Sequence, residues 1–179
     1  MAFEFTPENQ VKIKEIIAKY PSGKQKSAVM PLLDLGQRQN NNYISRDIIE
    51  EIANVLDMAP IQVYEVASFY SMYNLKPVGK FLIQVCGTTP CMLRGAEDLI
   101  RVCKEQLGIN REETSDDNLF TVKEVECLGA CTNAPMVQIN DDYYEDLNPQ
   151  IFTKILGDLR SGKAVKIGSQ TGRTTSEPQ

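Results

Sequence analysis

Two short stretches contain four of the five cysteines of this sequence: Cys86-Gly87-Thr88-Thr89-Pro90-Cys91 and Cys127-Leu128-Gly129-Ala130-Cys131. Two tight pairs that lie this far apart in the chain indicate two loops of one fold that converge on a metal centre. The chain contains no histidine. That absence excludes Ser-His-Asp and Cys-His catalysis, Cys₂His₂ zinc sites and Rieske centres, which all need an imidazole. An iron–sulfur cluster, an all-cysteine zinc site and disulfides remain as uses for the four thiols.

Length and composition indicate a globular protein with one good core and room for a helical extension. The chain has 179 residues, 42% of them apolar, and no apolar run approaches the ~20 residues that span a bilayer. Its first residues lack the apolar segment of a signal peptide and the Arg-rich character of a mitochondrial presequence. We therefore expect a chain used where it is made, or one already processed, and in a reducing compartment disulfides are rare. The odd number of cysteines also argues against disulfides, and the net charge of −5 argues against nucleic acid as a partner.

The first half of the chain predicts four helices. Thr6-Pro7 is a good helix start, with Thr6 as N-cap and proline at the first helical position. A second helix is expected over 25–39, and Pro31 must either lie in its first turn or kink it; Ser45 caps a third helix and Pro60 opens a fourth. The apolar positions at helical spacing are Ile48, Ile49, Ile52, Ala53, Val55 and Leu56 in the third helix, and Val63, Val66, Ala67 and Phe69 in the fourth.

The second half changes to the pattern of a small α/β sandwich. A buried strand is expected over 81–85, directly before Cys86, and an alternating strand over 120–126, directly before Cys127. A helix is expected over 92–107, a hairpin around Asn140-Asp141-Asp142, and a last helix from Asn148-Pro149 to about Leu159.

The expected fold class is therefore α/β, with an N-terminal helical bundle in front of the sandwich. We expect a helical domain over 1–77, the cysteine-bearing domain over 78–160, and an extended tail over 161–179 that orders on a partner.

The local chemistry around the cysteines suits anionic sulfur. Cys91 is expected in the first turn of a helix capped by Thr89, where backbone N–H groups and the helix dipole lower the pKa of a thiol. Gly87 and Gly129 are expected to let the backbone approach a bulky inorganic core. The C-x₄-C spacing recurs in ferredoxins, whereas structural zinc sites use shorter knuckles. Spacing thus favours iron–sulfur and leaves zinc open.

The fifth cysteine has a different pattern. Cys103 lies at helical spacing with Leu99, Ile100 and Leu107, so we expect a small buried side chain and not a ligand. In the sequence the cation nearest to the cysteine pairs is Arg94.

Two other stretches have alternative interpretations. Residues 44–70 have the pattern of a DNA-binding helix-turn-helix, but the second helix carries no Lys or Arg, and acidic residues outnumber basic ones between Ser45 and Phe69. We expect helix packing or protein docking there. The acidic run 141–146 would suit a divalent cation, but such runs are mostly solvated turns, and we interpret this one in that way.

With these residues placed, the chain resembles the 24-kDa-type subunit of respiratory complex I, a thioredoxin-like [2Fe–2S] ferredoxin. The resemblance covers nearly the whole length. The stretches that carry it include Tyr64-Glu65-Val66-Ala67-Ser68-Phe69-Tyr70, Thr89-Pro90-Cys91-Met92-Leu93-Arg94 and Glu124-Val125-Glu126-Cys127-Leu128-Gly129-Ala130-Cys131, together with 30–35, 74–80, 84–86 and 133–141.

The resemblance implies an electron carrier with one [2Fe–2S] cluster, whose four ligands fall on Cys86, Cys91, Cys127 and Cys131. It implies a flavoprotein partner that binds FMN and NADH, a second, multi-cluster iron–sulfur partner, and an N-terminal bundle that docks on the flavoprotein. It places the chain in the peripheral arm of the proton-translocating NADH:ubiquinone reductase, on the cytoplasmic face of a bacterial inner membrane or the matrix side of the mitochondrial one. The chain would have no catalytic residues of its own, and we expect no NADH oxidation from it in isolation.

Two alternatives stay open at this point. The same module occurs in soluble NAD-linked hydrogenases and formate dehydrogenases. A different class is a Cys₄ zinc structural module, which would be colourless where a cluster protein is reddish-brown.

Overall fold

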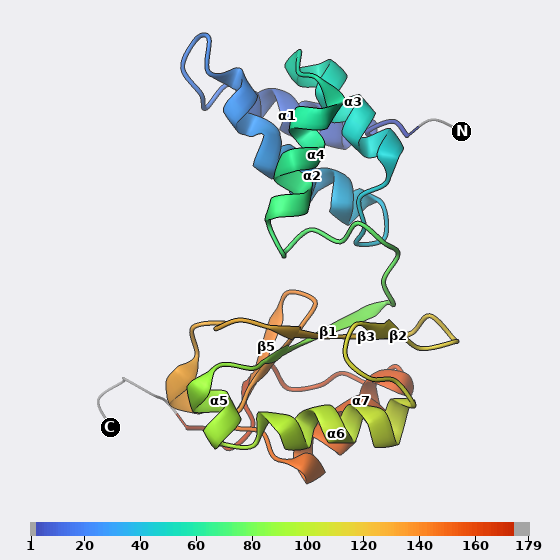
Figure 1. Cartoon of the computed structure of the whole chain (residues 1–179), viewed down its shortest axis with the longest axis vertical. Coiled ribbons are helices and arrows are strands. Elements are labelled where there is room, and N and C mark those ends of the chain that lie inside the picture. The colour runs from blue at the N-terminus through green and yellow to red at the C-terminus, as the bar shows by residue number, and fades with distance from the viewer. Residues whose placement is uncertain (1–2, 174–179) are drawn as a thin grey trace. The chain divides into compact units, whose positions relative to one another are not determined.

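The computed structural model describes residues 3–173, which form two compact units (Figure 1). The first unit ends at Val78 and the second begins at Gly79. Each has its own apolar core. The first two residues, and residues 174–179 of the predicted tail, lie outside the described residues.

Between residues 3 and 78 the structure is helical, as the sequence predicts. The elements are α1 (Pro7–Ile17), the 3₁₀ helix η1 (Gln25–Ala28), α2 (Val29–Gln39), α3 (Arg46–Leu56) and α4 (Pro60–Phe69). The predicted caps form, because the Thr6 hydroxyl accepts a hydrogen bond from the Asn9 amide at 3.3 Å and Ser45 accepts one from Ile48 at 3.4 Å. Pro31 lies in the first turn of α2, where it costs no helical hydrogen bond.

The core of the helical unit lies where α2, α3 and α4 meet. Leu32, Leu33, Ile48, Ile52 and Val63 are fully buried there. Two of the apolar positions at helical spacing do not face the core, since Val55 and Phe69 are 38% and 79% exposed. The buried face of α4 carries Val63 and Ala67, and Phe69, two residues further on, lies on the opposite side of the helix.

The second unit is a mixed sheet with the strand order β2-β3-β1-β4-β5-β6. The strands are β1 (Phe81–Cys86), β2 (Glu113–Thr114), β3 (Phe120–Val125), β4 (Val137–Ile139), β5 (Asp142–Glu145) and β6 (Gly168–Ser169). The neighbours β1 and β3 are parallel, as are β5 and β6, while β1 and β4, β2 and β3, and β4 and β5 are antiparallel.

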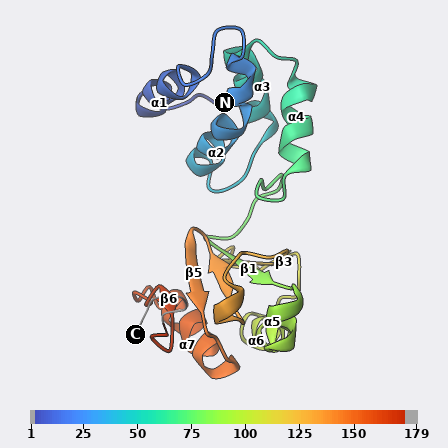
Figure 2. The same cartoon turned by 90° about the vertical axis from the view of Figure 1, so that its left-hand side faces the viewer.

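Helices cover one face of this sheet. They are α5 (Thr89–Leu93), α6 (Ala96–Leu107) and α7 (Pro149–Arg160), and α6 and α7 lie together on that face (Figures 1 and 2). Register places Ile83, Val122 and Ile139 side by side on three neighbouring strands, where they join the core with Leu99 and Phe152. The α/β sandwich behind a helical N-terminal part is confirmed.

Two predictions about elements need correction. The helix expected over 92–107 is two helices, because Gly95 has a φ of +105° and interrupts the chain between α5 and α6. Within the described part of the tail, Gly168–Ser169 form β6, which pairs with β5 of its own unit. No helix among residues 3–173 is both long and apolar enough to cross a membrane.

Candidate metal centre

Parallel pairing of β1 and β3 delivers the two cysteine stretches to one edge of the sheet. Cys86 is the last residue of β1 and is in register with Val125, the last residue of β3. The chain therefore leaves both strands at the same edge, the usual position of a site in an open α/β sheet.

The first loop buries its two cysteines. Cys86 and Cys91 are each 1% exposed, and Cys91 is the third residue of α5. The N-cap of α5 is Thr88 and not, as predicted, Thr89; the hydroxyl of Thr88 makes no cap and lies 3.3 Å from Cys86 Sγ. Because it caps no helix, the Thr88 hydroxyl is free to hydrogen-bond to the sulfur of Cys86.

The second loop leaves its two cysteines accessible. Cys127 and Cys131 are exposed, with their sulfur atoms 3.3 Å apart. Gly129 between them has a φ of +87°, a backbone conformation that favours glycine. The Tyr143 hydroxyl donates a hydrogen bond to the Leu128 carbonyl at 2.7 Å, which ties this loop to β5.

Hydrogen bonds cross from one loop to the other. The backbone amide of Leu128 donates to the sulfur of Cys86, and the Thr88 hydroxyl, which has one hydrogen atom, lies where it can donate to either Cys86 or Cys127. The Met136 amide donates to Cys91. The structure therefore brings together all four cysteines that the sequence singles out.

These contacts move the four pKa values in opposite directions within each pair. Burial raises the pKa of Cys86, but hydrogen bonds from the Thr88 hydroxyl and the amides of Leu128 and Thr88 outweigh it, so the pKa is lowered. Burial, followed by the hydrogen bond to Cys86, raises the pKa of Cys91 to about 12. The Gly129 amide, followed by Cys131 and Thr88, lowers the pKa of Cys127, and the hydrogen bond to Cys127 raises that of Cys131. In each pair, hydrogen bonds thus favour the thiolate form of one thiol, that of Cys86 or Cys127.

The donor set fits a [2Fe–2S] cluster, in which each of two irons takes two thiolates. The thiols are paired in that way, since Cys86 hydrogen-bonds to Cys91 and Cys127 to Cys131.

The remaining predictions about side chains have mixed outcomes. Cys103 is fully buried in α6, and burial raises the pKa of its thiol to about 12, so it is a core residue as predicted. A Cβ at Gly87 would collide with the Glu124 carboxylate, so the glycine leaves room for this side chain. In the acidic run, Asp146 binds Ser169 and Arg173, and Glu145 binds Asn133.

Sequence reasoning missed two polar groups at the site. Thr88 has Thr89 beside it, and the short loop alone does not say which of the two precedes α5. Arg173 donates a hydrogen bond to the carbonyl of Thr132, directly after Cys131, although 41 residues separate the two in the chain. Arg94, the nearest cation in the sequence, reaches the Ala134 carbonyl at 3.5 Å.

Comparison with known proteins identifies the family. The family described as "Thioredoxin-like [2Fe-2S] ferredoxin" matches residues 13–160. The chain belongs to this family of ferredoxins. Among relatives of the ferredoxin, NADH dehydrogenase [ubiquinone] flavoprotein 2, mitochondrial, of Dictyostelium discoideum is 51% identical over 175 residues, which cover 98% of this chain and 71% of the relative. A subunit of the NADH-quinone oxidoreductase of Rickettsia bellii is 54% identical over 159 residues, 89% of this chain and 95% of the relative.

A solved structure shares the fold of the ferredoxin. The air-oxidized NAD+-reducing [NiFe]-hydrogenase matches it with a TM-score of 0.64 and 17% sequence identity. The match covers 73% of this chain but only 23% of the hydrogenase chain. At this identity the likeness concerns the fold alone.

Proposed function

We propose that this ferredoxin is an electron-transfer subunit of an NADH–quinone oxidoreductase, and that Cys86, Cys91, Cys127 and Cys131 bind one [2Fe–2S] cluster. The observation that carries the proposal is the pairing of the four thiols, with hydrogen bonds that cross between their loops. Relatives named as subunits of such oxidoreductases, 51% and 54% identical, support the assignment to a respiratory enzyme.

The chain's own residues prepare the site for a bound anion. Amides of Leu128, Gly129 and Met136 and the hydroxyl of Thr88 all direct hydrogen atoms at sulfur. Such donors offset negative charge without a side-chain cation in contact with the sulfur. When bound, the cluster supplies one-electron transfer.

Exposure differs between the two pairs and suggests a direction for electron exchange. Cys86 and Cys91 are buried, whereas Cys127 and Cys131 face outward. A redox partner would therefore approach the cluster from the side of Cys127 and Cys131. On the side of Cys86 and Cys91, the surrounding protein would shield the cluster from water. In the proposed complex the first partner is the subunit that binds FMN and NADH, and the second is the multi-cluster iron–sulfur subunit. The chain would lie in the peripheral arm of the complex, on the cytoplasmic or matrix side of the membrane.

The division of labour between subunits can be tested directly. Flavin accepts a hydride from NADH as two electrons and can release them singly. We expect NADH to reduce the cluster of this chain only when the flavin-bearing subunit is added, as followed by the loss of visible absorbance under anaerobic conditions. Direct reduction by NADH without that subunit, or no reduction in its presence, would contradict the proposal.

A further inference from the structure

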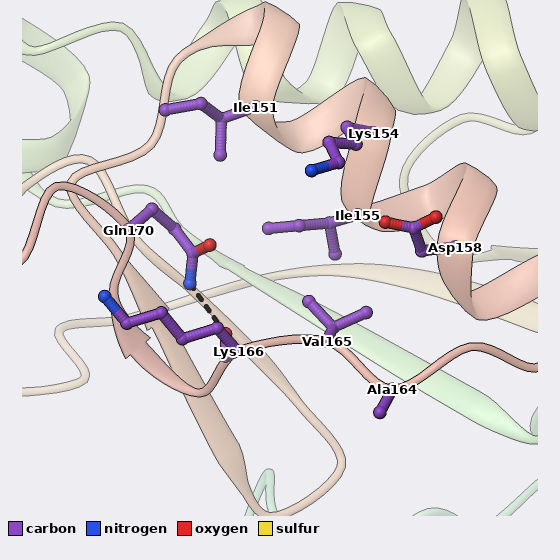
Figure 3. Close-up of a pocket in the computed structure, with 8 residues that line it drawn as sticks. All are labelled: Ile151, Lys154, Ile155, Asp158, Ala164, Val165, Lys166 and Gln170. Atoms are coloured by element: carbon purple, nitrogen blue, oxygen red, sulfur yellow. Dashed lines mark hydrogen bonds between the residues drawn. The ribbon is translucent and has the colours of Figure 1, made fainter.

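The segment that follows α7 makes a set of ordered contacts although it contains none of the proposed cluster ligands. We name residues 164–173 the C-terminal strap. Its first part lies along α7, where Val165 joins the core and faces Ile155 (Figure 3). The Gln170 side chain donates to the carbonyls of Lys166 at 2.7 Å and Gly168 at 3.0 Å and so holds the strap in a tight bend.

The middle of the strap is β6, which extends the sheet at β5. Gly168 is in register with Tyr144, and Ser169 with Glu145. The Gln170 amide then donates to the Glu145 carbonyl at 3.1 Å. This pairing carries the chain toward the end of the sheet where the second cysteine loop lies.

The end of the strap closes on Asp146. The Ser169 hydroxyl donates to one oxygen of this carboxylate, and the Arg173 guanidinium to the other, each at 2.6 Å. The Arg173 amide donates to Ser169 Oγ at 3.0 Å. The Asp146 side chain is only 9% exposed. Because a buried carboxylate is costly without partners, these contacts hold Ser169 and Arg173 at one position.

From Asp146 the contacts reach the second cysteine loop. Arg173 also donates to the Thr132 carbonyl, and the Asp146 amide donates to the Asn133 carbonyl at 2.8 Å. The Asn133 side chain donates to Glu145 at 2.7 Å. The turn η2 (Cys131–Asn133), which contains one of the proposed ligands, is thus fastened to β5 and to the strap.

We propose that Arg173 is a positioning residue for the metal centre, and that the strap exists to hold it against the Thr132 carbonyl and Asp146. The inference rests on the proposed function where it concerns the cluster. Arg173 fixes the backbone directly after Cys131, whose side chain is exposed and lies in a turn of three residues. It also places a positive charge beside a centre that becomes more negative on reduction. Loss of Arg173 should therefore loosen the loop and favour the oxidised cluster.

The first test needs no cluster. In the metal-free full-length chain, amide hydrogen exchange is measured at Asn133 and Ala134, whose amides bond to Ala130 and Cys131 within the turn. We expect Arg173→Gln to accelerate this exchange at least fivefold and to leave the amide of Ile83 in β1 protected. The matched control is Lys163→Gln, which removes a positive charge just before the strap from a residue that pairs with Asp158 at 3.6 Å. Equal exchange in the two variants would overturn the proposal.

The second test uses the reconstituted full-length protein. In an anaerobic redox titration, Arg173→Gln should shift the ratio of oxidised to reduced cluster at least threefold at a fixed potential, which is about 28 mV for one electron. The rate of cluster loss to a chelator should rise at least fivefold. Lys163→Gln should change the ratio and the rate by less than half as much.

Arg173→Lys separates the effect of hydrogen-bond geometry from the effect of charge. It also replaces Arg173→Gln as the test variant if the glutamine variant does not fold. Lysine keeps the charge but loses the planar fork that reaches two acceptors. We expect faster cluster loss with a redox ratio within twofold of the wild type. If both Arg173 variants lose the cluster at the same rate as the wild-type protein, Arg173 does not position the metal centre. If hydrogen exchange responds but even the wild-type chain binds no cluster, the proposed function fails while the role of the strap stands.

Discussion

Thr88→Val tests the shared hydroxyl at the centre of the site. Thr88 Oγ1 lies 3.3 Å from Cys86 Sγ and lowers the pKa of both Cys86 and Cys127, which belong to different loops. Valine has the same shape without the donor. The hydrogen bond that this hydroxyl gives to Cys86 or Cys127 is therefore lost, with little change in packing.

The size of the effect follows from the charge on the acceptor. A hydrogen bond to a charged group contributes about 1.5–3 kcal/mol. The reduction potential changes only by the part of this energy that grows when the centre gains an electron. If that part is about a third, roughly 0.5–1 kcal/mol, the potential should fall by about 20–40 mV for one electron.

The assay is a redox titration followed by EPR, with Thr89→Val as the matched control. Thr89 is the neighbouring residue with the same side chain, but it is exposed and is not among the donors to the four sulfurs. In metal-free protein, Thr88→Val should also slow alkylation of Cys127 at neutral pH, because the pKa of Cys127 rises. Equal potentials in the two valine variants would refute the role of the hydroxyl.

Three further predictions concern the cysteines and the partner. Alanine at Cys86, Cys91, Cys127 or Cys131 should abolish normal cluster assembly, whereas Cys103→Ala should keep the visible spectrum and cost roughly 1 kcal/mol or somewhat more in chemical denaturation; a bleached Cys103→Ala protein would show that the ligands are misassigned. In metal-free protein, stability should fall as pH rises from about 9 toward 12, because burial raises the pKa of Cys103 and of Cys91 to about 12 in the folded chain, and the folded state then binds more protons than the unfolded state. Cys103→Ala should reduce this loss by the part that Cys103 contributes, and an unchanged pH profile would count against the buried Cys103 thiol as one of its causes. The isolated chain with its cluster bound should not oxidise NADH when an artificial electron acceptor is supplied. Steady NADH oxidation would contradict the proposed division of labour between the subunits.

The sequence predicts well those elements whose signals are local. Thr6, Ser45 and Pro60 each mark a helix start by a chemistry confined to one turn, and all three start helices. The apolar runs before Cys86 and Cys127 likewise predict two strands that deliver the cysteines to one edge. The candidate site was accessible to sequence reasoning because strand ends and cysteine spacing carry it.

What the sequence could not predict depends on contacts between distant residues. β6 has two residues, too few for a periodic pattern, and it forms a strand because it pairs with the edge strand β5. Arg173 binds Thr132 and Asp146 across 41 and 27 positions of the chain, and nothing in a Gly-, Ser- and Thr-rich stretch signals such a contact. Phe69 continues an apolar pattern, but its place on α4 turns it away from the core.

The central claim is that four paired cysteines bind one [2Fe–2S] cluster, and metal analysis of the anaerobically reconstituted full-length chain tests it most directly. We expect two irons and two acid-labile sulfides per chain. The protein should be reddish-brown, and its EPR signal should appear on one-electron reduction. A colourless protein with zinc and no sulfide would contradict it.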